Sequence, residues 1–191
     1  MEIKTPHDPP ALDAEARAAL LRLARAAICA GVRGEDWSRP RALLPPLNEP
    51  GAAFVSLHLE GDLRGCIGVL RPSPTLAEAV AHCARAAALE DPRFAPLAAH
   101  ELARTLIEIS VLGALRPLAA AELPRPGVDG VVVAREDRQG LLLPQVAVGR
   151  GWSAERFLEE TCRKAGLPRD AWRRGALVSV FQAQVFSEAA T

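Results

Sequence analysis

The sequence has few lysines, few aromatic residues and no net charge. Aromatic residues make up 4% of its 191 residues, and the 23 basic side chains are balanced by 23 acidic ones. Lys4 and Lys164 are the only lysines. A neutral chain lacks the broad basic face on which nucleic-acid binding usually depends. The tryptophans Trp37, Trp152 and Trp172 form no series on which unpaired bases would stack. Nucleic-acid binding is therefore disfavoured, although a local basic patch stays open.

Long apolar runs are also missing. No run approaches the ~18 residues that a membrane span needs. The stretch "MEIKTPHDPPALDAEARAAL" has no apolar segment of the kind that a signal peptide carries. We therefore expect a cytoplasmic protein without a membrane anchor. Residues 1–11 are rich in proline and are predicted to form a flexible arm.

Cysteine and histidine spacings typical of metal-binding motifs are absent as well. Four cysteines and four histidines are scattered along the chain, and no two cysteines form a CxxC pair. We expect neither a metal site nor a cofactor. In a cytosolic protein the cysteines should be reduced, and most should pack as small apolar residues. They are Cys29, Cys66, Cys83 and Cys162.

Helical and strand patterns are interleaved in the rest of the chain without regular βαβ units. Helices are predicted where Asp13, Thr75 and Ser153 can cap the segments that follow them. This order predicts an α+β fold around a mostly antiparallel sheet flanked by helices. The predicted helices are 14–30, 76–89, 98–103 and 154–165. The predicted strands are 52–60, 63–70, 104–113, 130–135, 141–143 and 176–186, with the second turn near 137–140.

The stretch "GDLRGCIGVL" carries two glycines, an arginine and a thiol where a strand is expected, although glycine weakens a strand. A two-residue type II′ turn that begins at Gly61 predicts that Leu57 faces Cys66. Cys66 would then be buried among leucines, and its thiol would be inert. A bulge at Gly65 would instead turn Cys66 towards His58. The sequence leaves both registers open.

A functional interpretation of the same stretch is also open. Arg64 and Cys66 are two apart on one strand, so both side chains project to the same side. A neighbouring guanidinium favours a thiolate, which would make Cys66 a nucleophile. Gly65 and Gly68 would let a ligand lie against the backbone. We therefore expect the glycines to keep a cleft open, with Cys66 or Arg64 at its floor.

The segment "EDPRF" follows a predicted helix and supplies further polar groups. In the functional interpretation, Glu90 and Asp91 are acid or base groups beside the strand of Cys66, and Arg93 helps to bind a ligand. In the structural interpretation, the Asp91 side chain only bonds local backbone in a turn. Further along, Gln145 can offer its amide to a ligand or satisfy nearby backbone groups.

The motif "LRGCIG" resembles the signature of the AMMECR domain family, known in bacteria and archaea as AmmeMemoRadiSam system protein A. Five further segments are similar to family segments and occur in the family order: "EDPRF", "IEISVL", "GLLLPQVAV", "FLEETCRKAGLP" and "FQAQVF". The resemblance covers residues 12–188. It implies a single α+β domain with a larger sheet-containing lobe and a smaller lobe. Because the signature lies there, Arg64, Gly65, Cys66 and Gly68 are the strongest site candidates.

The resemblance implies partners but no particular reaction. The family name records two gene neighbours, a Memo-like protein and a radical SAM enzyme. One hypothesis is a small-molecule or modification enzyme, or its accessory subunit, that acts with these partners through Cys66. A non-catalytic adaptor and a nucleic-acid-binding module are the alternatives. A pocket at Cys66 would favour the enzyme, an apolar patch the adaptor, and a continuous arginine face the nucleic-acid module.

Overall fold

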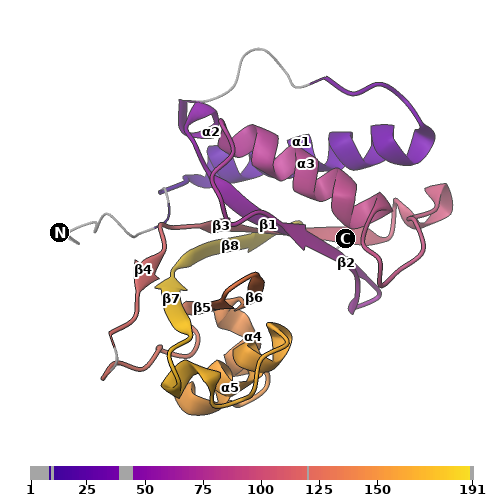
Figure 1. Cartoon of the computed structure of the whole chain (residues 1–191). Helices are drawn as coiled ribbons and strands as arrows, with labels where there is room; N and C mark the ends of the chain where they lie inside the picture. The colour runs from indigo at the N-terminus through magenta and orange to yellow at the C-terminus, as the bar shows by residue number, and fades with distance from the viewer. Residues whose placement is uncertain (1–8, 10, 39–44, 120, 190–191) are drawn as a thin grey trace. The chain divides into compact units, whose positions relative to one another are not determined.

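The chain forms two compact units, each with a four-stranded sheet that carries helices (Figure 1). Among the described residues, the larger unit comprises 11–38, 45–112 and 184–189, and the smaller unit comprises 9, 113–119 and 121–183. The predicted α+β fold with antiparallel pairing is confirmed. The computed structural model describes residues 9, 11–38, 45–119 and 121–189, so the predicted arm lies almost wholly outside the described residues.

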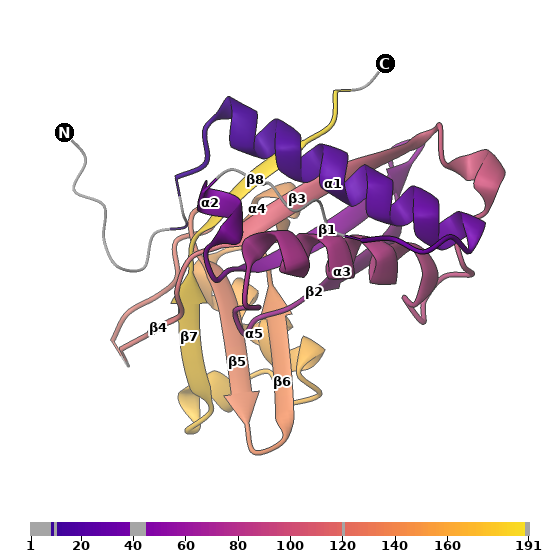
Figure 2. The ribbon, with the colours of Figure 1, turned by 90° about the horizontal axis from the view of Figure 1, so that it is seen from above.

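The larger unit places its long helices on one face of a sheet in the order β2-β1-β3-β8 (Figure 2). Strand β1 lies in the middle and pairs antiparallel with both β2 and β3. The elements of this unit are α1 (Ala14–Arg33), α2 (Pro45–Asn48), β1 (Ala52–Leu59), β2 (Asp62–Gly68), α3 (Leu76–Leu89), the 3₁₀ helix η1 (Ala99–Glu101), β3 (Thr105–Leu112) and β8 (Ala183–Ser187).

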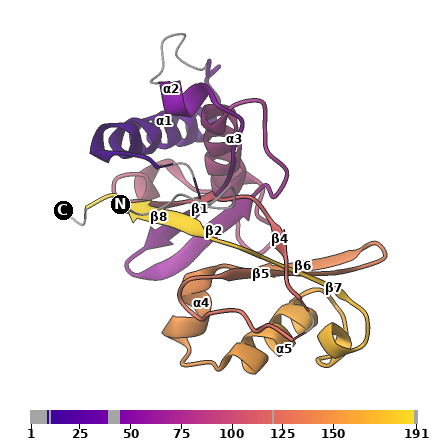
Figure 3. The same cartoon turned by 90° about the vertical axis from the view of Figure 1, so that its left-hand side faces the viewer.

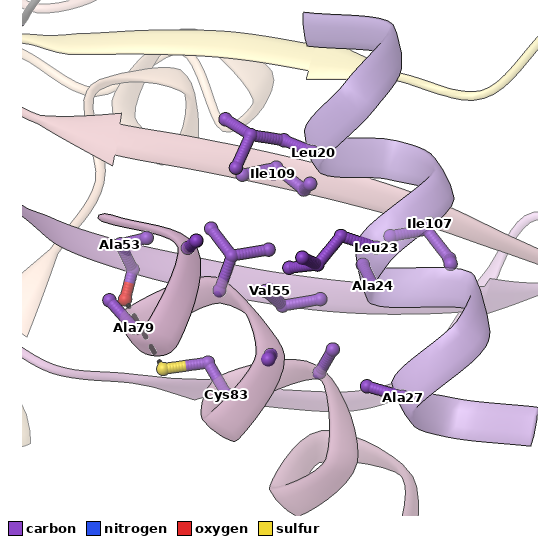
Figure 4. Packing of buried hydrophobic residues seen from close by; sticks show 14 of the residues in the cluster. Leu20, Leu23, Ala24, Ala27, Ala53, Val55, Ala79, Cys83, Ile107 and Ile109 are labelled. Carbon is purple, nitrogen blue, oxygen red and sulfur yellow. Dashed lines mark hydrogen bonds between the residues drawn. The ribbon is translucent and has the colours of Figure 1, made fainter. Parts of the chain in front are cut away.

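The core of the larger unit lies between these helices and the sheet (Figure 4). Leu20 of α1 and Val55 of β1 are fully buried there. The buried face of α3 consists mostly of alanines, whose small side chains let the helix backbone approach the sheet. Cys83 belongs to this face and donates a hydrogen bond to the carbonyl of Ala53 at 3.5 Å. Burial raises the pKa of the Cys83 thiol to about 12, so this thiol is packed and unreactive.

The ends of the helices in this unit follow their capping residues. Thr75 accepts the N–H of Glu78, and α3 spans the predicted residues. The predicted end of the first helix at Gly31 was wrong, because α1 continues to Arg33 and Gly34 adopts the left-handed conformation, with φ 68°. Gly31 instead lies against α3. The helix predicted at 98–103 is only the short turn η1.

The smaller unit packs α4 and α5 on one side of its sheet (Figure 3). The strand order is β4-β7-β5-β6, and each neighbouring pair of strands is antiparallel. Val131, Phe157, Leu158 and Cys162 are fully buried in its core. Its elements are β4 (Arg116–Pro117), β5 (Gly130–Arg135), β6 (Arg138–Leu142), α4 (Pro144–Gly149), α5 (Ala154–Lys164), the 3₁₀ helix η2 (Ala171–Arg173) and β7 (Leu177–Phe181).

Two strand predictions in the C-terminal part were wrong. The long strand predicted at 176–186 is divided at Gln182 into β7 and β8, which belong to different sheets. The carbonyl of Gln182 accepts the N–H of Gly113 at 2.9 Å, which the sequence pattern does not indicate. The hairpin turn predicted near 137–140 lies earlier, because Arg135 pairs with Arg138.

Candidate functional site

A β-bulge in the first hairpin decides which way Cys66 points. Leu57 pairs with Gly65 and His58 with Leu63, so Arg64 is the extra residue of the bulge. The simple register, in which Leu57 faced Cys66, was therefore wrong. The alternative with a bulge is confirmed, although the bulged residue is Arg64. Cys66 consequently lies on the sheet face opposite the helices, on the same face as His58.

The turn of this hairpin also differs from the prediction. Leu59 pairs with Asp62, so the two loop residues are Glu60 and Gly61. Their φ angles are 55° and 91°, and two positive values define a type I′ turn rather than type II′. The loop therefore has two residues, as predicted, but it begins one position earlier, and the twist of a type I′ turn matches that of the flanking strands.

Cys66 belongs to a row of polar side chains that runs across three neighbouring strands of the sheet. Cys66 pairs with Ser56 on β1, and Ser56 pairs with Glu108 on β3. The three side chains share a face, because residues directly opposite each other on antiparallel strands do so. The hydroxyl of Ser56 donates to Sγ of Cys66 at 3.3 Å. Cys66 is half-buried, whereas Cys83 and Cys162 are buried.

The loop after α3 holds the backbone of Cys66 from both sides. Oδ2 of Asp91 accepts the N–H of Cys66 at 2.8 Å. Nη2 of Arg93 donates to the carbonyl of Cys66 at 3.2 Å. Arg93 and Asp91 also bond each other, through Nε at 2.9 Å and Nη2 at 2.6 Å. We call Ser56, Cys66, Asp91 and Arg93 the Cys66 cluster.

Asp91 is an ionised, fully engaged carboxylate. Its side chain is 2% exposed, and the Arg93 guanidinium holds the pKa of this carboxyl well below its usual range. The same pair raises the pKa of Arg93. A carboxylate that stays ionised and bonded is a poor proton donor and a weak base near neutral pH. The geometry thus favours the structural interpretation of Asp91, with one addition: the backbone that it binds includes Cys66.

Contrary to the prediction, the side chain of Arg64 does not lie beside the thiol of Cys66. Its guanidinium pairs with both carboxylate oxygens of Glu101, at 2.9 and 3.0 Å, and donates to the carbonyl of Ala95 at 2.8 Å. This pairing lowers the pKa of Glu101. As the bulged residue, Arg64 is turned out of the alternation that would have placed it beside Cys66. The cation next to Cys66 is Arg93, whose side chain is 53% exposed.

The space beside both signature glycines is filled by protein. A Cβ at Gly65 would lie 2.1 Å from the carbonyl oxygen of Ala87, because the backbone of α3 passes directly over this strand. A Cβ at Gly68 would lie 2.1 Å from the ring of Phe54. The expectation that the glycines keep a ligand cleft open is therefore corrected: close packing explains both positions.

The remaining predicted site residues lie outside this cluster. Glu90 is exposed at the end of α3, where its backbone N–H donates to Ala86. Gln145 is half-buried in α4 of the smaller unit. Pro144 is the first residue of that helix, where proline is well tolerated.

Sequence reasoning missed two polar residues on the Cys66 face, Ser56 and Glu108, and named the third, His58, only as a neighbour of Cys66 in the bulged register. Their signal was the alternation of polar and apolar residues along β1 and β3, which places them together once the register is known. Nε2 of His58 is buried and has no hydrogen-bond partner among the described residues.

Two negative findings concern the described part of the chain. No group of three or more His, Cys, Asp or Glu side chains in the described ranges is placed to hold a metal ion. None of the helices there is long and apolar enough to cross a bilayer.

The sequence as a whole places the chain among proteins with an AMMECR1 domain. The AMMECR1 family model matches residues 21–186, and the chain belongs to this family. A protein from Thermofilum pendens is 44% identical over 93% of this chain and 92% of its own length. A protein from Aeropyrum pernix is 41% identical over 96% of this chain and 83% of its own.

A solved structure has the same fold. The uncharacterized protein PH0010 from Pyrococcus horikoshii is 37% identical to this chain, with a TM-score of 0.88, and the match covers 93% of each chain. The family and the fold are therefore shown by both sequence and structure.

Proposed function

We propose that this protein is a small-molecule or modification enzyme, or the thiol-bearing subunit of one, and that Cys66 is its reactive group. The proposal depends on one observation: three side chains bind the same residue of β2, Cys66. Ser56 donates to the sulfur, Asp91 binds the N–H and Arg93 binds the carbonyl of Cys66. A reactive group needs this kind of positioning, because a displacement of about 1 Å can cost ~100-fold in rate.

The neighbours of Cys66 also suit a thiol that reacts as a nucleophile. A hydroxyl that donates to sulfur stabilises negative charge as it develops there. Arg93 adds a positive charge beside the same residue, and half of its side chain is exposed. Its exposed edge can meet an anionic group of a substrate, since a guanidinium matches carboxylates and phosphates.

The proposed partners are a Memo-like protein and a radical SAM enzyme. The support for this part is the resemblance to AmmeMemoRadiSam system protein A, because that name records these two gene neighbours. In this scheme the chain contributes Cys66, and the partners contribute chemistry that its own residues lack.

Thiol labelling tests the role of Cys66. The protein carries Cys29→Ala, Cys83→Ala and Cys162→Ala, and iodoacetamide labelling is followed at neutral pH. We expect labelling in the folded state. The rate should fall about tenfold in Arg93→Gln, which loses a charged hydrogen bond, and recover partly in Arg93→Lys. Arg104→Gln is the matched control, because Arg104 is an exposed arginine that pairs with Glu60.

A Cys66 thiol that stays unlabelled until the protein unfolds would overturn the nucleophile role and leave the adaptor as the better hypothesis. If the triple variant folds poorly, the wild-type chain is labelled briefly and the modified cysteine is identified by peptide mass. Equal rates in Arg93→Gln and Arg104→Gln would remove Arg93 from the proposal.

A further inference from the structure

The larger unit contains a cavity of about 490 Å³ whose lining residues are all outside the Cys66 cluster. Its walls come from the second half of α1, from residues 102–106 and from residues 188–189. Small-molecule sites typically have volumes of about 300–1,000 Å³. The cavity is therefore large enough for a ligand of its own.

Helix α1 presents an arginine, a cysteine and a second arginine to this cavity. Arg25, Cys29 and Arg33 are four residues apart, and all three line it. This spacing places side chains on one stripe of a helix. Cys29 lies between the two arginines along the helix and is half-buried, so its side chain is not sealed in the core.

Arg25 and Glu188 form part of the wall of the cavity, and both already bind other groups of the protein. Arg25 pairs with Glu188 and donates to the carbonyls of Leu102, at 2.9 Å, and Thr105, at 2.6 Å. The second oxygen of Glu188 also accepts the N–H of Ile107 at 3.0 Å. The two opposite charges neutralise each other.

Arg33 is the remaining charge. It is exposed in the last turn of α1 and makes no hydrogen bond or ion pair that the described residues supply. The cavity thus has one net positive charge, while Leu102, Ala103 and Leu106 give it an apolar wall. A pocket with an apolar wall and one cation favours a ligand with an anionic group on an apolar body.

We propose that this cavity is a second small-molecule site, which binds a carboxylate attached to an apolar body. The carboxylate pairs with Arg33, the apolar body packs on Leu102 and Leu106, and the ligand covers the thiol of Cys29. The site is independent of Cys66 and of the reaction proposed for it.

Protection of Cys29 from labelling tests this site. The protein carries Cys66→Ala, while Cys83 and Cys162 are buried, and iodoacetamide labelling of Cys29 is located by peptide mass. The probe is 2-naphthoate, and its neutral amide, 2-naphthamide, is the matched control ligand. We expect naphthoate to slow the labelling of Cys29 and naphthamide to do so about tenfold less well, because the amide lacks the charge-assisted bond to Arg33.

Two variants of α1 distinguish binding at this cavity from a general effect of positive charge on the ligand. Arg33→Gln should abolish the preference for naphthoate over naphthamide. Arg22→Gln removes an exposed charge of the same helix that does not line the cavity, and it should keep the preference. The proposal is overturned if the two probes protect equally in the unsubstituted helix, if neither protects, or if Arg33→Gln and Arg22→Gln behave alike. None of these results bears on labelling of Cys66.

Discussion

Asp91 holds Cys66 by its backbone: the carboxylate oxygen Oδ2 accepts the N–H of Cys66 at 2.8 Å across 25 positions of sequence. Arg93 completes the contact by bonding both the carboxylate of Asp91 and the carbonyl of Cys66. The loop that follows α3 is thereby tied to the middle of β2, beside the thiol that we propose as the reactive group.

Asp91→Asn is expected to lower the free energy of unfolding by roughly 3 kcal/mol, because it leaves donors on Cys66 and Arg93 without their charged acceptor. Glu90→Gln is the matched control. This neighbouring side chain is exposed, and its loss should change the free energy by less than ~0.5 kcal/mol. Urea unfolding of both variants measures the difference. Equal stabilities would show that the contact contributes nothing.

The same carboxylate predicts how stability depends on pH. The pKa of Asp91 is lower in the folded chain than the ~3.9 of an unfolded Asp. Its stabilising contribution is therefore complete above that value and is lost as pH falls through the folded pKa. Below about pH 4 the wild-type protein should lose stability with falling pH more steeply than Asp91→Asn. Urea unfolding at a series of pH values tests this, and parallel curves would contradict it.

Gly65→Ala is expected to destabilise the protein by about 2–3 kcal/mol, because the new methyl group would overlap the carbonyl oxygen of Ala87 and force α3 away from the sheet. Gly149→Ala adds the same methyl group in α4, where nothing lies within 4 Å, and should be neutral or stabilise by up to ~1 kcal/mol. Thermal unfolding compares the two. A tolerated Gly65→Ala would contradict the close packing of α3 on this strand.

Tight sequence-independent binding to DNA or RNA is not expected at physiological salt, because the net charge is zero. Several arginines are also paired with acids, among them Arg64, Arg104 and Arg156. Fluorescence anisotropy with random oligonucleotides measures this. Submicromolar affinity that weakens steeply with added salt would prove the prediction wrong.

Local patterns predicted the elements whose signals lie within a few residues. Thr75 and Glu78 marked the start of α3, and the helix spans the predicted residues, because a capping box depends only on groups of one turn. The long C-terminal strand was wrong for the opposite reason. At the division, the carbonyl of Gln182 accepts a hydrogen bond from the N–H of Gly113. The sequence of the strand itself contains no signal for so distant a partner.

By itself, the sequence determined the α+β class, the family and the importance of the Cys66 stretch, since these follow from periodicity, caps and a run of contiguous residues. Only the tertiary structure decided what surrounds the thiol. A bulge of one residue at Arg64 exchanges the two faces of the strand, because side chains alternate with a period of two. That exchange placed Cys66 beside Ser56, gave the neighbouring positive charge to Arg93, and paired Arg64 with Glu101.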